Sequence, residues 1–500
     1  MEVAMEINQQ TIDFDKIWDE NKMNIVNYML NGIQLRKEQL ETIHNAITAP
    51  GMKAIIADEM GLGKTYTCMG LIQIARTLYP DKKIVITAPK NVLKNFEELI
   101  KSSIGITPIV VTGQQKDIEN LELNFNKHQV ILCQHSFWIN SLNGLVFMYN
   151  NLEKFSMAFF DEADFKEADG FNAYLEFMRE LPMGFLSNAT PIGENSLLIY
   201  NLLYGCGAYN DSYRKFRRKY ARQNYDNRNK LEETVLVSNI LNSFDRYITV
   251  KNRESIGIEV KVNINFYRVL PSKEQMHWMM NYEMPKNLAL YSPDTFNMES
   301  VPPEKRGPIN FTPKTMPAAF KMAELLIKNP KKSIVYVRNT DAIKKTAVIV
   351  KNLGKNPYII DGKHTPKDED VIRVQDAYNA DPNGVMITNI IKGTNLQTAR
   401  RLIIYNNPSD VQQLIYRMVR GFTSKEVEVD WIYYLGYEEA SIKKALEKTK
   451  NVSDLLDRNL DIIGQLEREL KANERYRKGK KEEEKIKTSW VNSISSVRIQ

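Results

Sequence analysis

Short apolar segments alternate with amphipathic stretches in two separate parts of the chain, and this alternation most constrains the fold. In the first part the segments are KAIIA (53–57), KIVITA (83–88), PIVVT (108–112), VILC (130–133), MAFF (157–160) and GFLSNA (184–189). In the second part they are SIVYV (333–337), PYII (357–360), GVMIT (384–388), RLIIYN (401–406) and VDWIYYL (429–435). Strands that alternate with helices build parallel sheets with crossover helices. The predicted fold class is therefore α/β, with two parallel-sheet lobes.

A chain of 500 residues exceeds one ordinary core, so several domains are expected. Composition along the chain divides it into an N-terminal extension (1–22), a first lobe (23–205), a helical insertion (206–314), a second lobe (315–450) and a charged helical tail (451–500). The tail contains RYRKGKKEEEKIK, which is typical of a solvated helix or a frayed end.

The segment IIADEMGLGKT (55–65) ends like a phosphate-binding loop. It follows a strand-like segment and opens a helix-like one, which is the context that such a loop needs. Gly61 and Gly63 allow backbone N–H groups to converge on phosphate oxygens at a helix N-terminus. Lys64 would reach the terminal phosphates, and the Thr65 hydroxyl would bind Mg²⁺. Asp58 stands where the general pattern has its first glycine.

Two adjacent carboxylates end the strand-like segment in MAFFDEAD (157–164). Asp161 is suited to hold Mg²⁺ through water, and Glu162 is suited to polarise the attacking water. A strand running into an acidic solvated turn would be a common structural explanation for this segment alone. Together with the preceding loop, the carboxylates indicate a nucleoside triphosphatase that uses ATP and Mg²⁺.

The motifs resemble, in order through about 420 residues, the SWI/SNF-type DNA translocases of helicase superfamily two. ADEMGLGKT resembles the family's first motif, in which an aspartate at the position of Asp58 is normal. The other resembling segments are LRKEQ (35–39), TAPKNVLKNFEE (87–98), DEADFKE (161–167), SNATPIGEN (187–195), YIIDGKHTPKDEDVIRVQDAYN (358–379), MITNIIKGTNLQTARRLIIYN (386–406) and QQLIYRMVRGF (412–422). The chain departs from the family at Glu38, at Asp164, and at Lys392-Gly393-Thr394.

The resemblance implies two RecA-like lobes with a nucleotide between them. Expected nucleotide contacts are Gln39 at the adenine edge, the loop residues Asp58, Glu59, Met60, Gly61, Leu62, Gly63, Lys64 and Thr65, and Gly393 of the second lobe. Arg417 and Arg420 are spaced as the family's arginine pair. Independently of the family, two arginines three residues apart share one helix face, from which they can neutralise charge on a transferred phosphoryl group.

Double-stranded DNA is the partner that the resemblance implies. It places Lys90, Asn91 and Thr388 in segments that contact DNA. The best local candidate for a DNA-binding segment is YRKFRRKYARQNYDNRNK (213–230), which contains eight basic residues and one acidic residue. The strongest candidates within it are Arg214, Lys215, Arg217 and Arg218. Basic helices of this kind bind phosphates through salt-sensitive contacts. A solvated helical face is the competing structural interpretation.

Two other functions stay open at the level of sequence. The letters DEAD at 161–164 are found in RNA helicases, although the loop reads ADEMGLGKT and a long insertion separates the lobes. A strand-separating DNA helicase of a neighbouring group belongs to the same alternative. A subunit that binds ATP and DNA as a switch, with little turnover, is the second alternative. The three departures from the family pattern keep it open, whereas the intact set of Lys64, Asp161, Glu162, Arg417 and Arg420 speaks against it.

Composition sets weaker limits. The formal charge of 68 − 61 = +7 permits a polyanionic partner without requiring one. The three cysteines lack metal-type spacing and are predicted to be core residues in a reducing cytoplasm. We find no apolar run of about 18 residues and no signal-peptide pattern at the N-terminus. A compact motor rich in Lys, Asn and Ile favours a bacterial or viral source, so we expect a cytoplasmic protein that is not secreted.

Overall fold

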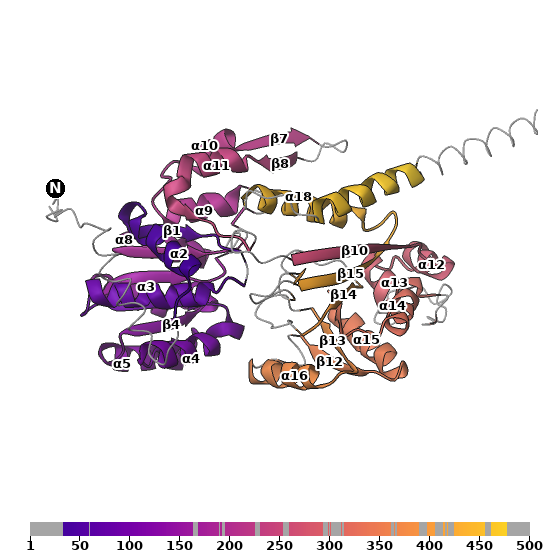
Figure 1. The fold of residues 1–500 in the computed structure, drawn as a ribbon, viewed down its shortest axis with the longest axis horizontal. Coiled ribbons are helices and arrows are strands. Elements are labelled where there is room, and N and C mark those ends of the chain that lie inside the picture. Colours follow the sequence, from indigo (N-terminus) through magenta and orange to yellow (C-terminus); the bar gives the residue numbers. More distant parts are fainter. Residues whose placement is uncertain are drawn as a thin grey trace, which may run out of the picture.

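In the computed structural model, two parallel sheets lie side by side, each covered by helices (Figure 1). The residues it describes are 34–59, 61–163, 169–189, 191–192, 196–225, 231–253, 260–293, 299, 301, 312, 315–361, 365, 368–389, 398–405, 414–415, 418, 425–455 and 462–477. The predicted α/β class with two parallel-sheet lobes is confirmed. Each of the eleven predicted strand segments, six in the first lobe and five in the second, overlaps an observed strand.

The first sheet has the strand order β3-β4-β2-β5-β6-β1-β9 in the described residues, and all its pairs are parallel. Its strands are β1 (Lys53–Ile56), β2 (Lys83–Ala88), β3 (Ile109–Val111), β4 (Val130–Gln134), β5 (Phe155–Phe160), β6 (Met183–Ser187) and β9 (Ile248–Thr249). Its helices are α2 (Lys37–Thr48), α3 (Lys64–Leu78), α4 (Leu93–Ile104), α5 (Gln115–Asn124), α6 (His135–Asn140), α7 (Leu142–Asn150), α8 (Asp169–Glu180) and α9 (Leu197–Gly205). Short 3₁₀ turns are η1 (Pro50–Met52), η2 (Lys90–Val92), η3 (Phe125–Lys127), η4 (Leu152–Lys154) and η5 (Asp245–Tyr247).

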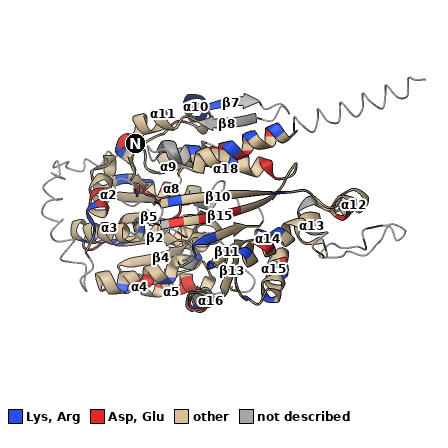
Figure 2. Ribbon diagram, turned by 45° about the vertical axis from the view of Figure 1, so that its right-hand side comes forward, with Lys and Arg blue, Asp and Glu red and all other residues tan. Residues whose placement is uncertain are grey.

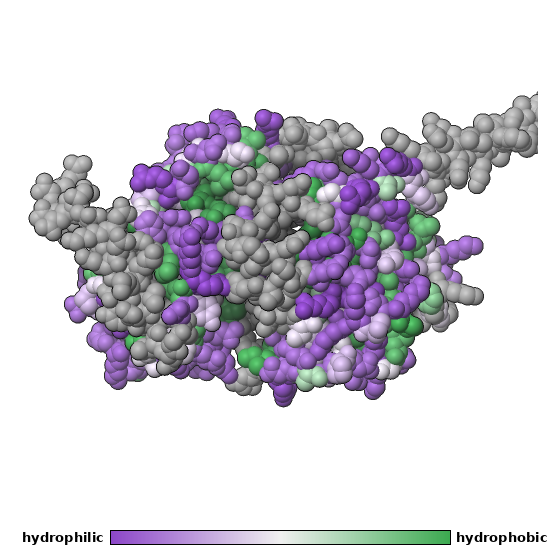
Figure 3. Space-filling model, viewed as in Figure 1, coloured by the Kyte–Doolittle hydropathy of each residue, from purple (hydrophilic) through white to green (hydrophobic). Residues whose placement is uncertain are grey.

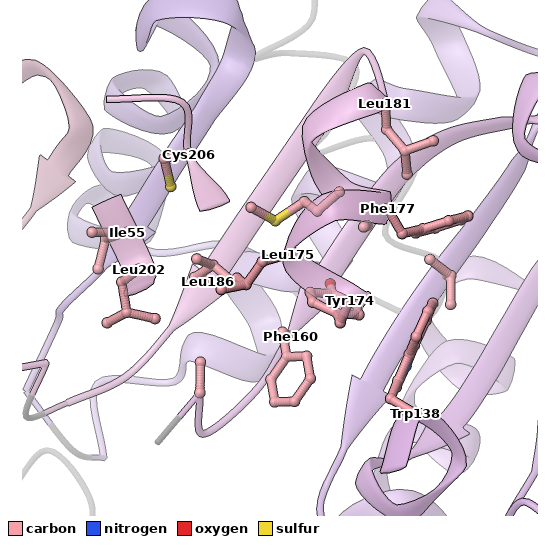
Figure 4. Packing of buried hydrophobic residues seen from close by; sticks show 14 of the residues in the cluster. Ile55, Trp138, Phe160, Tyr174, Leu175, Phe177, Leu181, Leu186, Leu202 and Cys206 are labelled. Carbon is pink, nitrogen blue, oxygen red and sulfur yellow. The ribbon is translucent and has the colours of Figure 1, made fainter. Parts of the chain in front are cut away.

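Both faces of the first sheet are buried, which explains why its strands are almost continuously apolar. Successive residues of β1 and its extension alternate between two cores: Ile55 and Ala57 enter one, whereas Ala54 and Ile56 enter the other. The first core contains an aromatic group in which Trp138 lies edge-on to Tyr174 at 4.9 Å (Figure 4). All three cysteines are buried free thiols, as predicted.

The second sheet has the order β10-β15-β14-β11-β13-β12, again parallel throughout. Its strands are β10 (Val260–Val269), β11 (Ser333–Tyr336), β12 (Asn356–Ile360), β13 (Gly384–Thr388), β14 (Arg401–Ile404) and β15 (Lys425–Tyr434). Its helices are α12 (Lys273–Asn281), α13 (Lys286–Tyr291), α14 (Pro317–Lys328), α15 (Thr340–Asn352), α16 (Asp368–Ala380) and α18 (Glu439–Leu455). Two further cores cover its two faces.

The region predicted as a helical insertion, 206–314, is shared between the two sheets. It supplies β9 to the edge of the first sheet and β10 to the edge of the second. Between α10 (Tyr213–Tyr220) and α11 (Val237–Phe244) it forms an antiparallel hairpin of β7 (Ala221–Tyr225) and β8 (Leu231–Val235). Strands β9 and β10 belong to different sheets, so the chain passes from the first sheet to the second between residues 249 and 260. Both strands pair with partners that are far away in the sequence.

Part of the C-terminal tail packs against the second sheet instead of lying in solvent. Residues 462–477 are helical, and Leu466 is fully buried in the core on one face of that sheet. Gln465 donates a 2.7 Å hydrogen bond to the backbone oxygen of Val262, and Glu469 receives a bidentate pair from Arg268. The segment predicted to be solvated, RYRKGKKEEEKIK, begins at 475, and its residues from 478 onward lie outside the described part of the chain.

The two lobes touch at several places. Helix α18 of the second lobe contacts α11, and α16 contacts η2 of the first lobe. Ala189, which follows β6, packs against a core of the second lobe. On the face drawn in Figure 3, hydrophilic side chains cover most of the described surface of the second lobe. Among the described residues, no helix has both the length and the apolar character needed to cross a bilayer.

Candidate functional site

The predicted phosphate loop joins β1 to α3, as the sequence indicated. Gly61 has a φ of 89° and Gly63 a φ of 82°, so both adopt the left-handed conformation that glycine tolerates. Gly63 also lacks room for a side chain, since a Cβ atom there would lie 2.5 Å from Nε2 of Gln39. Lys64 is the first residue of α3 and Thr65 the second. Met60 lies outside the described residues.

The side chain of Lys64 folds over the loop. Its ammonium group donates hydrogen bonds to the backbone oxygens of Asp58, at 2.7 Å, and of Glu59, at 3.4 Å. The ammonium group of Lys64 therefore lies beside the backbone N–H groups at the start of α3. Phosphate oxygens would be attracted to the ammonium group and to these N–H groups.

Asp58 ties the loop to two other parts of the lobe. Its carboxylate accepts hydrogen bonds from Thr42 of α2, at 2.7 Å, and from Thr249 at the end of β9, at 3.5 Å. Burial raises the pKa of Asp58 to about 6, against the opposing effects of the Thr42 hydrogen bond and the charges of Lys64 and Lys251. The aspartate that replaces the usual glycine is thus a buried link between elements.

Gln39 and Arg36 hold the loop from the side of α2. Nε2 of Gln39 donates to the backbone oxygens of Gly63, at 3.2 Å, and Leu62, at 3.4 Å, and its Oε1 caps the N-terminus of α2. Nη2 of Arg36 donates to the oxygen of Leu62 at 2.7 Å. The role of Gln39 at an adenine edge stays a prediction, whereas its contact with the loop is part of the structure.

Asp161 lies at the end of β5, and its position is fixed from three sides. Its backbone N–H donates to the oxygen of Thr87 at 2.8 Å, and the hydroxyl of Ser187 donates to its Oδ1 at 3.0 Å. Its backbone oxygen accepts from Nε2 of His135 at 2.8 Å, while the imidazole stacks on Phe160 at 4.6 Å. Since β6 lies between β1 and β5, Ser187 connects the carboxylate strand to the loop strand.

Helix α3 packs against β5, the strand that Asp161 follows. Burial raises the pKa of the Cys68 thiol in α3, and the charge of Asp161 adds to this effect. Thr65 is three residues before Cys68 and therefore shares its helix face. Glu162 adopts a φ of 51°, a backbone conformation that costs a non-glycine residue on the order of 1 kcal/mol and recurs at functional sites.

The motif after β6 connects the two carboxylates with the second lobe. Asn188 donates to the oxygen of Ala163 at 2.6 Å, and its own N–H donates to the oxygen of Ile56 in β1 at 3.0 Å. The next residue, Ala189, is the one that packs against the second lobe. This short segment thus touches β1, the carboxylate turn and the opposite lobe.

The second-lobe candidates are less completely described. Arg417, Arg420 and Gly393 lie outside the described residues, although Ile415 and Met418 beside them are buried in the second lobe's core. Thr388 is at the end of β13 and fully buried, so its side chain does not reach the surface on which a DNA contact was predicted.

The DNA candidates of the first half lie on the surface. Lys90 is exposed in η2; the side chain of Asn91 is not described. In α10 the buried Phe216 and Tyr220 share one face. The rest of the helix is largely basic, as its blue colour in Figure 2 indicates. The exposed basic residues of α10 are Arg214, Lys215, Arg218 and Lys219. Arg217 instead forms an ion pair of 2.6 Å with Glu233, and the helix ends at Tyr220, ten residues before the end of the basic segment.

Some residues of the site escaped prediction because their roles depend on distant partners. Thr42, Ser187 and His135 touch the loop or Asp161 only through sheet order and helix packing. The SNA triplet of 187–189 was the one available signal, and it pointed to the motif without giving the partner of Ser187.

The residues present fit a nucleoside triphosphate with Mg²⁺. The glycines give a loop with left-handed backbone, Lys64 supplies the ammonium group, and Asp161 and Thr65 supply hard oxygen donors of the kind that Mg²⁺ prefers. Among the described residues, no group of three or more His, Cys, Asp and Glu side chains could hold a metal by itself.

Comparison with known proteins adds three kinds of match. The family model described as SNF2-related domain matches residues 23–283. The DNA repair and recombination protein RAD54-like of Danio rerio is 32% identical over 83 residues, 15% of this chain. The ATP-dependent DNA helicase DDM1 of Arabidopsis thaliana is 29% identical over 118 residues, 22% of this chain. The chain spans only 11% and 15% of the lengths of these two proteins.

Two solved structures resemble the chain over most of its length. The Sulfolobus solfataricus SWI2/SNF2 ATPase core in complex with double-stranded DNA is 14% identical with a TM-score of 0.38, covering 87% of this chain and 99% of that one. The Pyrococcus furiosus Hef helicase domain is 13% identical with a TM-score of 0.47, covering 82% and 97%.

Proposed function

The chain belongs to the SNF2-related family, and from that premise we propose that it is an ATP-dependent translocase on double-stranded DNA. Membership makes it a helicase-like ATPase. The observation that carries the proposal is the joining of the Lys64 loop to Asp161 through β6, in a chain that continues into a second parallel sheet. Hydrolysis at this site would move the second lobe relative to the first.

The proposed roles at the site follow from its chemistry. Lys64 and the backbone N–H groups of α3 bind the phosphates, and Glu162 orients the attacking water. Thr65 and Asp161 would hold Mg²⁺, which neutralises phosphate charge when bound. Asp58, Glu59, Met60, Gly61, Leu62 and Gly63 shape the loop, whereas Gln39 and Gly393 are assigned to the nucleotide, and Arg417 and Arg420 to the transferred phosphoryl group.

Duplex DNA is proposed as the polymer for two reasons. The names of the matched relatives concern DNA. The chain also has exposed basic residues on α10 and at Lys90 of η2, both at the surface of the first lobe. Contacts with phosphates at these positions would hold the backbone without reading sequence. A bacterial or viral source and a cytoplasmic location stay predictions from composition.

Steady-state ATP hydrolysis with different polymers tests the proposal. We expect duplex DNA to stimulate turnover more than single-stranded DNA or duplex RNA, and we expect this stimulation to fall as salt rises. The Lys64→Ala variant serves as the blank, because it removes the amine while leaving the rest of the loop. Stimulation by RNA alone would indicate an RNA helicase, and no turnover with any polymer would indicate a nucleotide switch.

A further inference from the structure

The chain that leaves the first lobe runs beside the phosphate loop before it reaches the second lobe. Residues 249–253, which we call the strap, extend the parallel pairing of β1 and β9 past the ends of both strands. The N–H of Ala57 donates to the oxygen of Thr249, and the N–H of Glu59 donates to the oxygen of Lys251, both at 2.8 Å. The loop backbone from 57 to 59 is therefore the neighbour of the strap.

Every second residue of the strap also binds the loop or the neighbouring helix α2 through its side chain or its N–H. Thr249 donates to Asp58, and Lys251 forms an ion pair with Glu41 of α2. The N–H of Arg253 donates to Oε2 of Glu59 at 2.8 Å, and Nη1 of Arg253 lies 3.8 Å from Oε1 of the same carboxylate. This alternation is the period of an extended chain.

The ion pair of Glu59 with Arg253, the last residue of the strap, is buried. The side chain of Arg253 is 0% exposed and that of Glu59 is 2% exposed. A buried ion pair contributes little net stability, because removing both charges from water offsets much of their attraction, but breaking it leaves a buried charge without its counter-ion. Such a pair therefore favours the one arrangement of the loop and the strap in which both charges are in contact.

The strap is followed in the chain by the edge strand of the second sheet. The next described element, β10, begins at Val260 and pairs with β15 along ten residues, from Val260 opposite Lys425 to Val269 opposite Tyr434. Glu59 and Arg253 are in contact, so the strap joins the phosphate loop to the part of the chain that continues to the edge strand of the second lobe. The strap is thus a covalent route from the phosphate site to the other lobe.

We propose that Arg253 is a positioning residue that couples the conformation of the phosphate loop, through Glu59, to the placement of the second lobe. This inference rests on the proposed function, because it assigns to one residue the transmission that a two-lobe motor requires. In the proposed function the nucleotide phosphates bind at Lys64, five residues after Glu59, so the loop between these two residues lies next to them. Arg253 touches the loop from the side of the strap.

The test separates nucleotide binding from movement of the lobes. Dyes are placed on cysteines introduced at Leu123→Cys in α5 and Val348→Cys in α15, where the native side chains are 80% and 56% exposed. The three native cysteines are buried and should label slowly. Energy transfer between the dyes is measured with and without a non-hydrolysable ATP analogue, and the affinity for the analogue is measured separately in the full chain.

We compare Arg253→Met, Arg253→Lys and the double variant Glu59→Gln with Arg253→Met. The double variant removes both buried charges, so that no uncompensated charge unfolds the protein. Unfolding is then excluded as the cause of a lost change in energy transfer. The matched control is Arg268→Met, which breaks the ion pair of Arg268 with Glu469 in the second lobe, away from the loop. Melting temperatures establish that each variant is folded.

We expect Arg253→Met to keep the affinity for the analogue within about three-fold of the wild type while losing the nucleotide-dependent change in energy transfer. The double variant also changes the loop residue Glu59, so it is judged only by the loss of that change. Arg253→Lys should restore part of that change, and Arg268→Met should leave it intact. An unchanged response in Arg253→Met and the double variant would overturn the inference. So would a parallel loss of affinity and response in Arg253→Met, which is what a merely structural role predicts.

The results also distinguish a failure of this coupling from a failure of the proposed translocase function. A wild-type protein that lacks DNA-stimulated turnover but shows a nucleotide-dependent response that Arg253→Met abolishes would refute the translocase and keep the coupling. A wild-type protein with stimulated turnover and no response to nucleotide would refute the coupling alone.

Discussion

The hydroxyl of Ser187 donates a hydrogen bond of 3.0 Å to Oδ1 of Asp161. The two residues end neighbouring strands, β6 and β5, and β6 also pairs with β1, from which the phosphate loop departs. The carboxylate assigned to Mg²⁺ is therefore oriented by the strand that separates it from the loop. The order of the strands in the sheet thus determines which residue orients the Asp161 carboxylate.

Replacement of Ser187 by alanine should weaken catalysis without unfolding the lobe. A hydrogen bond to a charged group contributes about 1.5–3 kcal/mol, so we expect DNA-stimulated turnover to fall by about ten-fold or more, and the Mg²⁺ concentration for half-maximal turnover to rise. Ser156→Ala is the matched control, because Ser156 is also fully buried in the first sheet but donates to the backbone oxygen of Lys83. Equal effects of the two variants would argue against orientation of Asp161.

Replacement of Gly63 by alanine should abolish nucleotide binding through a local clash. The new Cβ would lie 2.5 Å from Nε2 of Gln39 on a backbone with a φ of 82°. Gly354→Ala is the control for backbone strain alone, since Gly354 has a φ of 72° and open space around it. Both variants should lose on the order of 1 kcal/mol of stability from strain. A fluorescent ATP analogue should bind Gly63→Ala at least about ten-fold more weakly and Gly354→Ala normally.

Asp58 should make the stability of the protein depend on pH. Burial raises the pKa of this carboxyl from 3.8 to about 6, which places roughly 3 kcal/mol of unfavourable free energy on its ionised form. The cost is fully present above about pH 6 and disappears as the pH falls toward 3.8. We therefore expect Asp58→Asn to raise the melting temperature at pH 8 and to raise it less at pH 5.

The exposed Asp376 of α16 provides the control for this experiment. Its replacement by asparagine removes the same charge without relieving burial, so the difference from wild type should be small at both pH values. An Asp58→Asn variant that is less stable than the wild type at pH 8 would mean that the bonds to Thr42 and Thr249 outweigh the cost of the buried charge.

The exposed arginines of α10 should contribute to DNA binding and to its salt dependence. We expect the double variant Arg214→Ala with Arg218→Ala to bind duplex DNA more weakly, with a slope of log affinity against log salt that is less negative by roughly two. Lys344→Ala with Lys351→Ala is the matched control, because both lysines are exposed on α15 of the second lobe. Titrations at several salt concentrations measure both slopes, and equal slopes for the two double variants would remove α10 from the interface.

The strands of both lobes could be predicted because their signal is local. Segments such as KIVITA (83–88) and GVMIT (384–388) are β-branched, bounded by turns, and buried on both faces, and the observed β2 and β13 have the same bounds. The phosphate loop could be predicted for a similar reason, since glycines and a lysine at fixed spacing carry the mechanism themselves.

What the sequence did not provide depends on partners far along the chain. Strand β10 reads as part of an insertion until it is seen paired with β15, more than 150 residues later. The basic segment 213–230 reads as one helix, but a hairpin takes over at Ala221, where β7 finds its partner β8. In the same way, the burial of Arg253 against Glu59 follows from the course of the strap along the loop.

Displacement of a third strand from a DNA triplex measures translocation most directly. The duplex carries the triplex at one end, and release of the third strand is followed with ATP, with a non-hydrolysable analogue, and with the Lys64→Ala variant. A translocase on double-stranded DNA should release the third strand only when it hydrolyses ATP, with a delay that grows with the length of duplex before the triplex. Stimulated hydrolysis without release of the third strand, or release by Lys64→Ala, would contradict this account.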